Sequence, residues 1–319
     1  MAALSQDDIK SMSIFHPWAL TRINRLMKPK NNLKLSYYTS AKVALDIIKE
    51  KKVWMRNAKC MNDFREVEHG IDNILKFLRT NSNRKAFMKV MENCFSGSAK
   101  EVDNLFTGWQ DDIRWNTYIT CLSEHRCKKD VFGRLSMWRA YSHGSTGIAF
   151  ILNPTEFPFD PGPLNIYLTP VAYFEDQRFA KEFRAVIKRV NSERSYIKQQ
   201  GRELLINGMF NALVYGTIAS KHPGFEEEAE WRVVHFHKMH NTAHLEKNVE
   251  VVNETPQTVY KIPLGKAGGI LDFEKLLNKI IIGPCAFPVN VREAFIAALG
   301  DAGIKDPESR VVASEIPLR

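Results

Sequence analysis

The chain has 319 residues and a formal net charge of +9, and 44% of its residues are hydrophobic. This length and composition allow one large core or two modest ones, and they argue against disorder over most of the chain. No apolar stretch approaches the roughly 20 residues that a membrane span needs. The first 13 residues lack the basic start and apolar block of a secretory signal. We therefore expect a cytoplasmic protein without membrane contact.

The five cysteines are odd in number, widely spaced and free of any CxxC pair, so we expect no disulfide framework. Cys121, His125 and Cys127 lie close together in sequence, but no second ligand pair at zinc-finger spacing accompanies them. The four histidines between residues 235 and 244 form a second cluster. We interpret it as a solvated strand end, with metal ligation as the alternative. We predict no metal.

The chain begins with a lead-in over residues 1–32, irregular or helical, in which Pro17 and Pro29 interrupt regular structure. Thr39 or Ser40 is placed to cap the first helix that follows. Composition and spacing predict a strand at 33–40, a helix at 41–50 and a strand at 52–57.

Apolar residues recur at helical spacing from about residue 67 to residue 115. They form three successive stripes, and Asn, Ser and Gly interrupt the sequence between the stripes. We predict a helical insertion that packs on a sheet.

The rest of the chain alternates between helical and strand patterns before it becomes rich in strands. In the middle of the chain, the patterns predict strands at 117–123, 146–152 and 171–174, and helices at 135–142, at 175–200 and from there to about 219. In the last third, they predict a helix at 291–300 and strands at 230–236, 248–252, 258–264, 279–284 and 310–316. There are no repeats and no linker rich in Pro, Gly or Ser. This order favours a single α+β domain over residues 33–319.

Basic residues are spread along the chain, with local runs at 22–34 and 126–130. Distributed positive charge favours a polyanionic partner, because it neutralises phosphates. No nucleic-acid motif of defined spacing accompanies the charge. The excess of basic residues therefore favours nucleic acid as a partner but does not identify one.

The stretch KHPGFEEEAEWRVV, residues 221–234, runs against this balance. It places four carboxylates in five positions just before a predicted strand. One interpretation is a solvated turn. The other is a catalytic carboxylate that is held at the start of the strand.

Polar and aromatic residues interrupt otherwise structural runs in several segments. These segments are YYTS (37–40), MNDFREVEHG (61–70), LSMWRAYSHGSTGIAF (135–150), KHPGFEEEAEWR (221–232), IIIGP (280–284) and SEIPLR (314–319). Taken in order, they resemble a widespread bacterial family known as domain of unknown function 2971. The resemblance extends from about residue 33 to residue 319, and by itself it implies no activity.

The first of these segments has a more distant resemblance with chemical content. A strand that ends in an aromatic residue, followed by Thr-Ser and a short helix, is similar to the first motif of the ADP-ribosyltransferases. This likeness implies that Tyr37 contacts the nicotinamide-side ribose of NAD, where that superfamily has His or Arg, and that Thr39 and Ser40 support it. The alternative is an aromatic core pair with a serine cap.

The acidic stretch resembles the Glu-x-Glu motif of the same superfamily, whose Glu lies beside the nicotinamide ribose at the start of a late strand. Cleavage of the nicotinamide bond builds positive charge on the ribose, and a fixed carboxylate stabilises that charge. The resemblance implies that Glu230 is the catalytic residue and Glu228 its helper, whereas Glu227 points away on an extended chain. The alternative is an ion pair of Glu230 with Arg232 or Arg139.

The helix predicted at 135–142 offers further contacts to NAD. Trp138 and Tyr141 share a helical face from which they would stack on the nicotinamide or adenine ring. Arg139 would bind the pyrophosphate through two hydrogen bonds. The alternative for Trp138 is a core anchor of the helix.

The MNDFRE segment permits two interpretations. Asn62 and Asp63 favour a turn, because their side chains hydrogen-bond the local backbone. Alternatively, Asp63 and Glu66 join Arg56 in lining the nucleotide cleft.

Together, the resemblance implies a split mixed β-sheet core like that of the ADP-ribosyltransferases, and an enzyme that cleaves NAD and transfers ADP-ribose to a macromolecule. The basic balance favours nucleic acid over protein as the acceptor. A toxin or phage-defence effector, with an antitoxin or regulatory protein as partner, would fit this family by analogy. The alternative function is a non-catalytic module that binds a nucleotide or a partner, and a metal-free nuclease is a third candidate.

Overall fold

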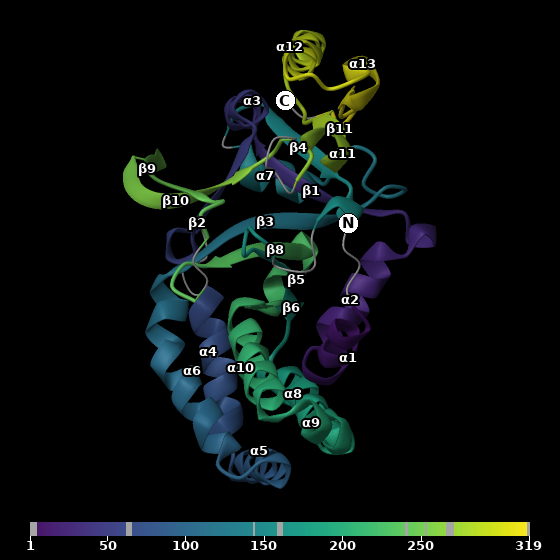
Figure 1. The fold of residues 1–319 in the computed structure, drawn as a ribbon. Coiled ribbons are helices and arrows are strands. Elements are labelled where there is room, and N and C mark those ends of the chain that lie inside the picture. The colour runs from purple at the N-terminus through teal and green to yellow at the C-terminus, as the bar shows by residue number, and fades with distance from the viewer. Residues whose placement is uncertain are drawn as a thin grey trace.

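The computed structural model describes residues 5–61, 66–142, 144–157, 162–239, 242–252, 254–265 and 271–317. The turn predicted at Asn62 and Asp63 lies outside these ranges, and so does the side chain of Glu66. Within them, no helix combines the length and the apolar character that crossing a membrane would require. The predicted combination of a mixed sheet with many helices is confirmed (Figure 1).

One large sheet organises the described residues. Its strands are β1 (Leu33–Ser40), β2 (Lys52–Asn57), β3 (Thr117–Arg126), β4 (Gly147–Leu152), β5 (Tyr167–Pro170), β8 (Glu230–Phe236), β9 (Glu246–Val252), β10 (Thr255–Pro263), β11 (Leu277–Ile282) and β12 (Val311–Ala313). They run in the order β12-β11-β4-β1-β3-β2-β10-β9, while β8 pairs with β3 and also with β5. The strands β11 and β12 are parallel and the other pairs in this sheet are antiparallel.

The sheet divides along one edge of β3. Residues 33–36 of β1 pair with 123–126 of β3, and residues 56–57 of β2 pair with 118–119. Between these two registers, residues 120–122 of β3 pair with neither described strand on this edge, although β8 pairs with them on the other. The chain of β1 beyond Ser36 therefore leaves β3 and opens a wedge between β1 and β2.

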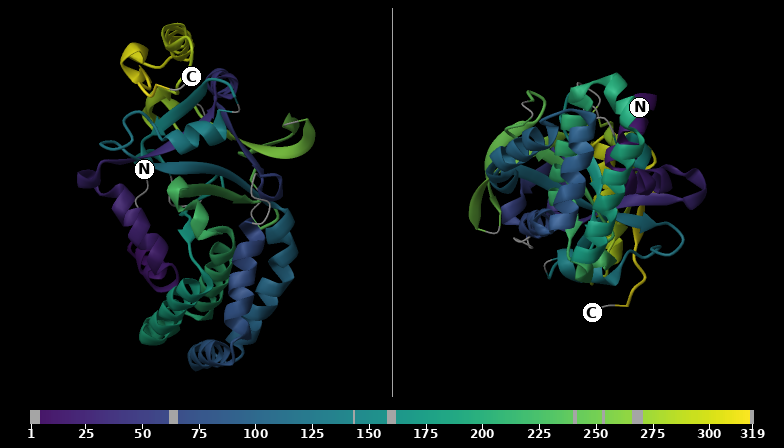
Figure 2. Two further views of the ribbon diagram at one scale, coloured as in Figure 1. Left: turned by 180° about the vertical axis from the view of Figure 1, so that it is seen from behind. Right: turned by 90° about the horizontal axis from the view of Figure 1, so that it is seen from below.

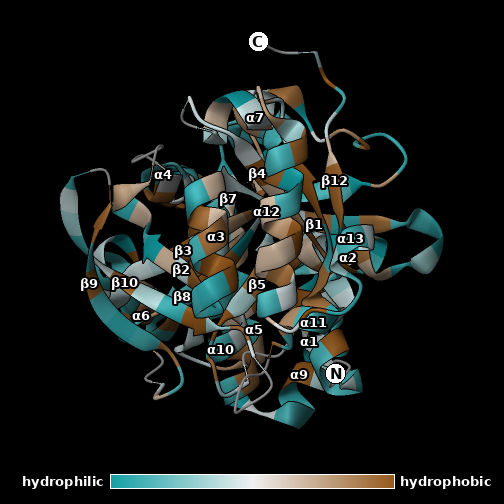
Figure 3. Ribbon diagram, turned by 90° about the horizontal axis from the view of Figure 1, so that it is seen from above, coloured by the Kyte–Doolittle hydropathy of each residue, from teal (hydrophilic) through white to brown (hydrophobic). Residues whose placement is uncertain are grey.

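Three helices cover one face of this sheet. They are α2 (Pro17–Met27), α3 (Ala41–Glu50) and α12 (Pro288–Asp301). Alternate strand residues such as Ile148 and Phe150 pack against them in the largest core, since successive side chains of a strand point to opposite faces. Seen from above, α3 and α12 lie next to each other over the strands, and hydrophobic and hydrophilic residues alternate along both (Figure 3).

The opposite face carries α7 (Leu135–Tyr141) and, beside it, a bundle of helices. The bundle contains α1 (Gln6–Phe15), α4 (Glu66–Arg79), α5 (Asn81–Cys94), α6 (Ser98–Trp115), α8 (Asp176–Ser192), α9 (Arg194–Gln200) and α10 (Arg202–Ile218). These helices share a second core that includes Ile119 and Val234 of the sheet, and they extend away from it as a layer of their own (Figures 1 and 2). A third, smaller core joins α7 to β1, β4 and β11.

Two findings add to the predicted organisation. The predicted helices at 67–115 are present, but they form their core together with α1, α8 and α10 rather than as one insertion. The lead-in is also not separate, because Ile14 and Phe15 of α1 are buried in the bundle and Ile23 and Leu26 of α2 are buried against the sheet.

Some smaller elements also differ from the prediction. The single helix expected at 175–200 is interrupted at Glu193, where α8 ends and α9 begins. The sequence pattern missed β5. The strand expected at 171–174 is β6 (Ala172–Tyr173), which pairs in parallel with β7 (Ser220–Lys221) outside the large sheet.

The contact between α4 and α10 depends on a glycine. A Cβ atom at Gly70 would lie 2.0 Å from the main-chain oxygen of Thr217. We expect Gly70→Ala to lower the free energy of unfolding by about 1–3 kcal/mol, because the two helices must move apart. Gly108→Ala on α6 is the control. Its Cβ would meet no atom within 4 Å, so the better helix propensity of alanine should stabilise the protein by about 0.5–1 kcal/mol. Urea denaturation measures the free energy of unfolding of both variants. An equal change in the two variants would contradict the argument that Gly70 is needed for close helix packing.

Candidate functional site

The acidic stretch forms a turn of 3-10 helix that leads into β8. The 3-10 helix spans Pro223–Glu228, and the side chain of His222 accepts a hydrogen bond from the Gly224 N–H at its start. Ala229 has a left-handed conformation with φ of 45°, and β8 begins at Glu230. The predicted strand start is confirmed. The extended conformation expected before it is wrong, because Pro and Gly start a helical turn here instead.

Glu230 is buried between two cations. Its side chain is 3% exposed, its Oε1 accepts a hydrogen bond from Arg232 Nε at 2.7 Å, and its Oε2 lies 3.0 Å from Lys221 Nζ. Burial alone would raise the pKa of Glu230, but the charges of Arg232 and Lys221 outweigh burial and hold this pKa well below its usual range. The ion pair with Arg232, which the sequence offered as the alternative, is therefore present.

These contacts fix Glu230 in place and close it to solvent. Its main-chain N–H donates to the phenol oxygen of Tyr173 at 2.8 Å, and its carbonyl accepts from the Val171 N–H at 3.0 Å. Arg232 is itself only 1% exposed. A carboxylate that two cations already neutralise is poorly suited to contact a ribose. We infer that Glu230 orients Lys221 and Arg232 instead of meeting a substrate itself.

Glu228 is the carboxylate of this pair that solvent reaches. Its side chain is 25% exposed, and its Oε2 lies 2.7 Å from Lys221 Nζ. Lys221 is buried, with its ammonium group between Glu228 and Glu230 and 4.7 Å from the ring centroid of Phe225. Glu228 and Glu230, which were predicted to act together, are therefore neighbours. Lys221 joins them, whereas the prediction placed them on one face of an extended strand.

Tyr141 stands at the end of α7, near both carboxylates. Burial raises the pKa of its phenol, and the negative charges of Glu228 and Glu230, together with Cys121, raise it further. The phenol is half-buried and keeps its proton at neutral pH. It is thus available as a hydrogen-bond donor beside the reachable carboxylate.

Tyr37 lies where the sheet divides. It belongs to the part of β1 that has left β3, and the hydroxyl groups of Thr39 and Thr120 lie near its phenol. Burial raises its pKa, Cys121 raises it further, and the positive charge of Arg56 and the two threonine hydroxyls lower it. Arg56 in turn donates to Gln257 Oε1 at 3.2 Å. The structure therefore brings Tyr37, Thr39 and Arg56 together at the wedge.

Cys121 on β3 connects the two groups. It lies near enough to Tyr37, Tyr141 and Glu230 to contribute to the pKa shift of each. We call Tyr37, Cys121, Tyr141, Glu228 and Glu230 the Cys121 centre. Sequence reasoning treated Cys121 only as an unsupported metal ligand and missed this position.

The family comparison bears on one side of this centre. Residues 137–233 match the model of the family described as Protein of unknown function (DUF2971). The DUF2971 segment includes Tyr141, Lys221, Glu228 and Glu230, whereas Tyr37 and Cys121 precede it. The match is shorter than the extent of 33–319 expected from the motifs. No curated protein and no solved structure matches the chain.

Two predicted contacts within the DUF2971 segment do not reach the Cys121 centre. Trp138 is 3% exposed, meets the Tyr38 ring edge to face at a centroid distance of 4.8 Å, and donates from Nε1 to the Phe132 carbonyl at 3.1 Å. It is a core anchor, so the predicted stacking on a nucleotide ring is wrong. Arg139 is exposed, and no hydrogen bond or ion pair joins it to another described residue.

Ser40 has the capping role that the sequence predicted. Its side chain accepts a hydrogen bond from the Val43 N–H at 3.4 Å, at the start of α3. This confirms the cap and supports the structural alternative for Ser40, since its hydroxyl is engaged with the helix and not with the Cys121 centre.

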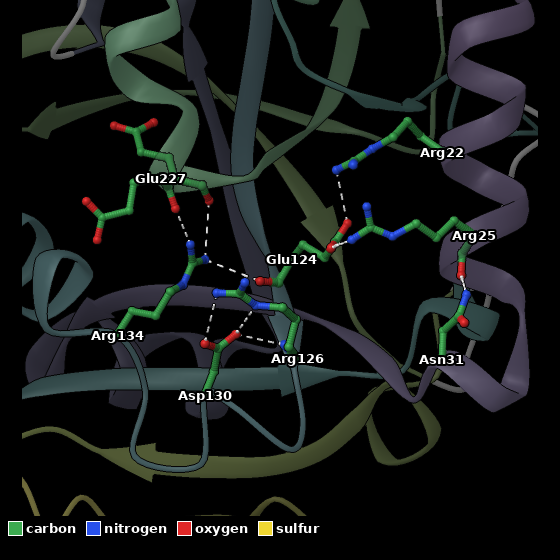
Figure 4. A network of polar contacts seen from close by, with 9 residues as sticks. Arg22, Arg25, Asn31, Glu124, Arg126, Asp130, Arg134 and Glu227 are labelled. Atoms are coloured by element: carbon green, nitrogen blue, oxygen red, sulfur yellow. Dashed lines mark hydrogen bonds and ion pairs between the residues drawn. The ribbon is translucent and has the colours of Figure 1, made fainter.

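The side chain of Arg134, the residue before α7, binds main-chain oxygens of the acidic turn. Its guanidinium donates to the carbonyl oxygens of Glu227, Glu228 and Glu124, the last two at 3.2 and 3.3 Å (Figure 4). Its own N–H donates to the Tyr38 hydroxyl at 3.0 Å. Arg134 therefore ties the 3-10 helix, β3 and α7 together. Contacts to carbonyl oxygens have no side-chain motif, so nothing in the sequence indicates this role of Arg134.

The same network reaches the N-terminal helices. The buried carboxylate of Glu124 pairs with Arg22 at 3.1 Å and with Arg25, both on α2 (Figure 4). Arg126 and Asp130 form a neighbouring pair in the loop after β3. The lead-in is thus linked through Glu124 to the turn that carries Glu228.

Within the described ranges, no group of three or more His, Cys, Asp and Glu residues is arranged to hold a metal ion. Of the histidine cluster, His235 Nδ1 lies 3.1 Å from the Asn165 carbonyl and His237 Nδ1 lies 2.6 Å from the Tyr260 hydroxyl. His240 lies outside the described residues. The two described strand histidines thus take part in hydrogen bonds of the protein itself.

Proposed function

We propose that the chain is an ADP-ribosyltransferase-like enzyme that cleaves NAD and transfers ADP-ribose to a macromolecule. The observation that carries the proposal is that Tyr141 lies near the reachable carboxylate of Glu228 and the buried carboxylate of Glu230, while Tyr37 lies at the place where the sheet divides. These residues come from segments far apart in sequence, as expected of an enzyme site built on a sheet.

The chemistry assigns the central role to Glu228 in place of Glu230. In the proposed reaction the bond between the ribose C1′ and the nicotinamide nitrogen breaks, and its electron pair leaves with neutral nicotinamide. Positive charge then develops on the ribose, where the Glu228 carboxylate stabilises it. The acceptor's oxygen or nitrogen forms the new bond to C1′, and its proton passes to Glu228 or to water. Tyr37 and Tyr141 donate hydrogen bonds to the ribose or the amide.

Charge supports nucleic acid as the acceptor class, because a chain of net charge +9 attracts phosphates. Under this proposal the protein acts as a toxin or phage-defence effector, and an antitoxin or regulatory protein restrains it. This extension rests on analogy with the superfamily.

A second candidate is a non-catalytic module that binds a nucleotide or a partner. The observation that favours it is the charge balance of the Cys121 centre, where Lys221 and Arg232 face Glu228 and Glu230. Two cations against two carboxylates leave little net negative charge to stabilise a ribosyl cation. Such a centre would bind a dinucleotide without cleaving it.

One experiment distinguishes the two candidates. The protein is incubated with NAD labelled on the adenylate, together with RNA, DNA or protein, and both label transfer and free nicotinamide are followed. We expect Glu228→Gln to reduce both by about a hundredfold or more, because an electrostatic contact to the transition state is lost, while NAD affinity changes much less.

Glu227→Gln is the matched control. Glu227 is exposed, and its Oε1 accepts a hydrogen bond from Ser136 Oγ at 2.7 Å. We expect this variant to retain full activity. Binding of NAD without nicotinamide release by the wild-type protein would support the second candidate, and the absence of both would overturn the proposal.

A further inference from the structure

A cavity lies where α1 and α2 meet α8 and α10, next to the short strands β6 and β7. Its volume is about 110 Å³. Figures 1 and 2 both show α1 beside α8, and the cavity lies at the corner between α1 and α2. Six aromatic rings line part of its wall: Phe15, Trp18, Phe174, Phe179, Phe183 and Tyr215.

The charge of this cavity at neutral pH comes from one residue. Of the described residues that line it, those with titratable side chains are His16, Glu182 and Tyr215. Burial lowers the pKa of His16 to about 4, and burial also raises the pKa of Tyr215 well above its usual value, with a further contribution from Tyr167. Both side chains are therefore neutral at pH 7, and the Glu182 carboxylate supplies the charge.

Glu182 is available to a ligand. Its side chain is half-buried at the wall of the cavity. No hydrogen bond or ion pair joins its carboxylate to another of the described residues. Its carboxylate is therefore free to pair with a cation that enters the cavity.

The aromatic wall already attracts a cation from the protein. The guanidinium carbon of Arg178 lies 4.7 Å from the centroid of Phe174, whose ring also meets that of Trp18 edge to face at 5.4 Å. Aromatic faces attract cations through their quadrupole, and the attraction is larger where water is excluded. Rings of this kind next to one carboxylate form the arrangement that recognises organic ammonium groups.

We propose that this cavity binds a small organic cation, an alkylated ammonium group whose apolar body contacts the aromatic rings and whose charge faces Glu182. The volume of about 110 Å³ suits a head group of the size of about three to four water molecules. Phosphates and carboxylates are excluded as ligands, because Glu182 would repel them. The proposal is independent of the function proposed for the Cys121 centre.

The test compares choline with its uncharged isostere 3,3-dimethylbutan-1-ol, which has the same shape. Binding of both to the full chain is measured by isothermal titration calorimetry at pH 7.5. We expect choline to bind at least about tenfold more tightly than the isostere, because only choline has the charge that interacts with the rings and with Glu182.

Two variants test whether the preference for choline over its isostere arises in this cavity. Glu182→Gln should bring choline to the affinity of the isostere, whereas Glu203→Gln, which removes the same charge from an exposed position on α10, should leave the preference unchanged. Equal binding of both compounds to the wild-type protein, binding of neither, or a preference that survives Glu182→Gln would each overturn the proposal. Thermal melting without ligand checks that both variants fold.

Discussion

Replacing Glu230 by glutamine is expected to lower the free energy of unfolding by about 3 kcal/mol or more, because the loss of one partner leaves buried charges uncompensated. Arg232 is 1% exposed and would lose its carboxylate, and Lys221 would lose one of the two carboxylates with which it pairs. Urea denaturation followed by tryptophan fluorescence measures the effect. This outcome differs from that of a catalytic carboxylate, whose replacement would reduce activity and leave stability nearly intact.

Acid provides a second measurement on the same variant. The folded-state pKa of Glu230 is held below its unfolded value, which is about 4.3 for glutamate. Its contribution is therefore fully present above that unfolded value and is lost as the pH falls through the folded-state pKa. We expect the unfolding free energy of Glu230→Gln to fall less steeply than that of the wild type below about pH 5. Glu227→Gln, at an exposed position, should change stability by less than about 0.5 kcal/mol and should keep the acid sensitivity. A stable Glu230→Gln protein would return Glu230 to the list of catalytic candidates.

Replacing Trp138 by alanine is expected to cost about 3–5 kcal/mol of stability, as for other large buried side chains. The indole occupies a slot lined by glycines. A Cβ at Gly133 would lie 2.4 Å from its Cζ2, and one at Gly283 would lie 2.9 Å from its Cε3. Because glycine backbone forms part of the slot, the space left by the indole has few side chains beside it that could fill it.

Trp115→Ala is the matched control for this prediction. Trp115 is 57% exposed at the end of α6, and we expect a cost below about 1 kcal/mol, mainly from the lost contact with Lys59, whose ammonium lies 5.1 Å from the ring centroid. Thermal melting of both variants decides the matter. If Trp138→Ala melted like the control, the indole would be free to contact a ligand after all.

The sequence predicted elements best where the signals are local. The strand, cap, helix and strand of residues 33–57 are confirmed to the residue, because alternation, a serine cap and a four-residue apolar stripe each act within a few residues. The break between α8 and α9 at Glu193 has no proline or glycine to mark it. The division of the bundle between two chain segments depends on tertiary packing and has no local signal.

The site was predicted only in part, for a related reason. Sequence reasoning could predict the start of β8 at Glu230 and the ion pair of Glu230 with Arg232. Both are local features, since the two paired residues lie within three positions of each other in the same strand. Lys221 was missed because its role depends on a short strand, β7, that pairs with β6 about 48 residues earlier in the chain. The contacts of Cys121 and Arg134 likewise depend on register and on main-chain atoms, which side-chain motifs do not report.

The way in which Arg134 holds the acidic turn has a consequence for how this protein can diversify. Every group that its guanidinium contacts on that turn is a carbonyl oxygen, which all amino acids provide. Substitutions at positions 226 and 227, whose side chains are exposed, can therefore change the charge, size and chemistry that the turn presents without altering the path of its backbone. The backbone of the turn is held in place by Arg134, while the exposed side chains on it can vary. Laboratory evolution confined to positions 226 and 227 should yield folded proteins at high frequency, and randomisation of position 134 should not.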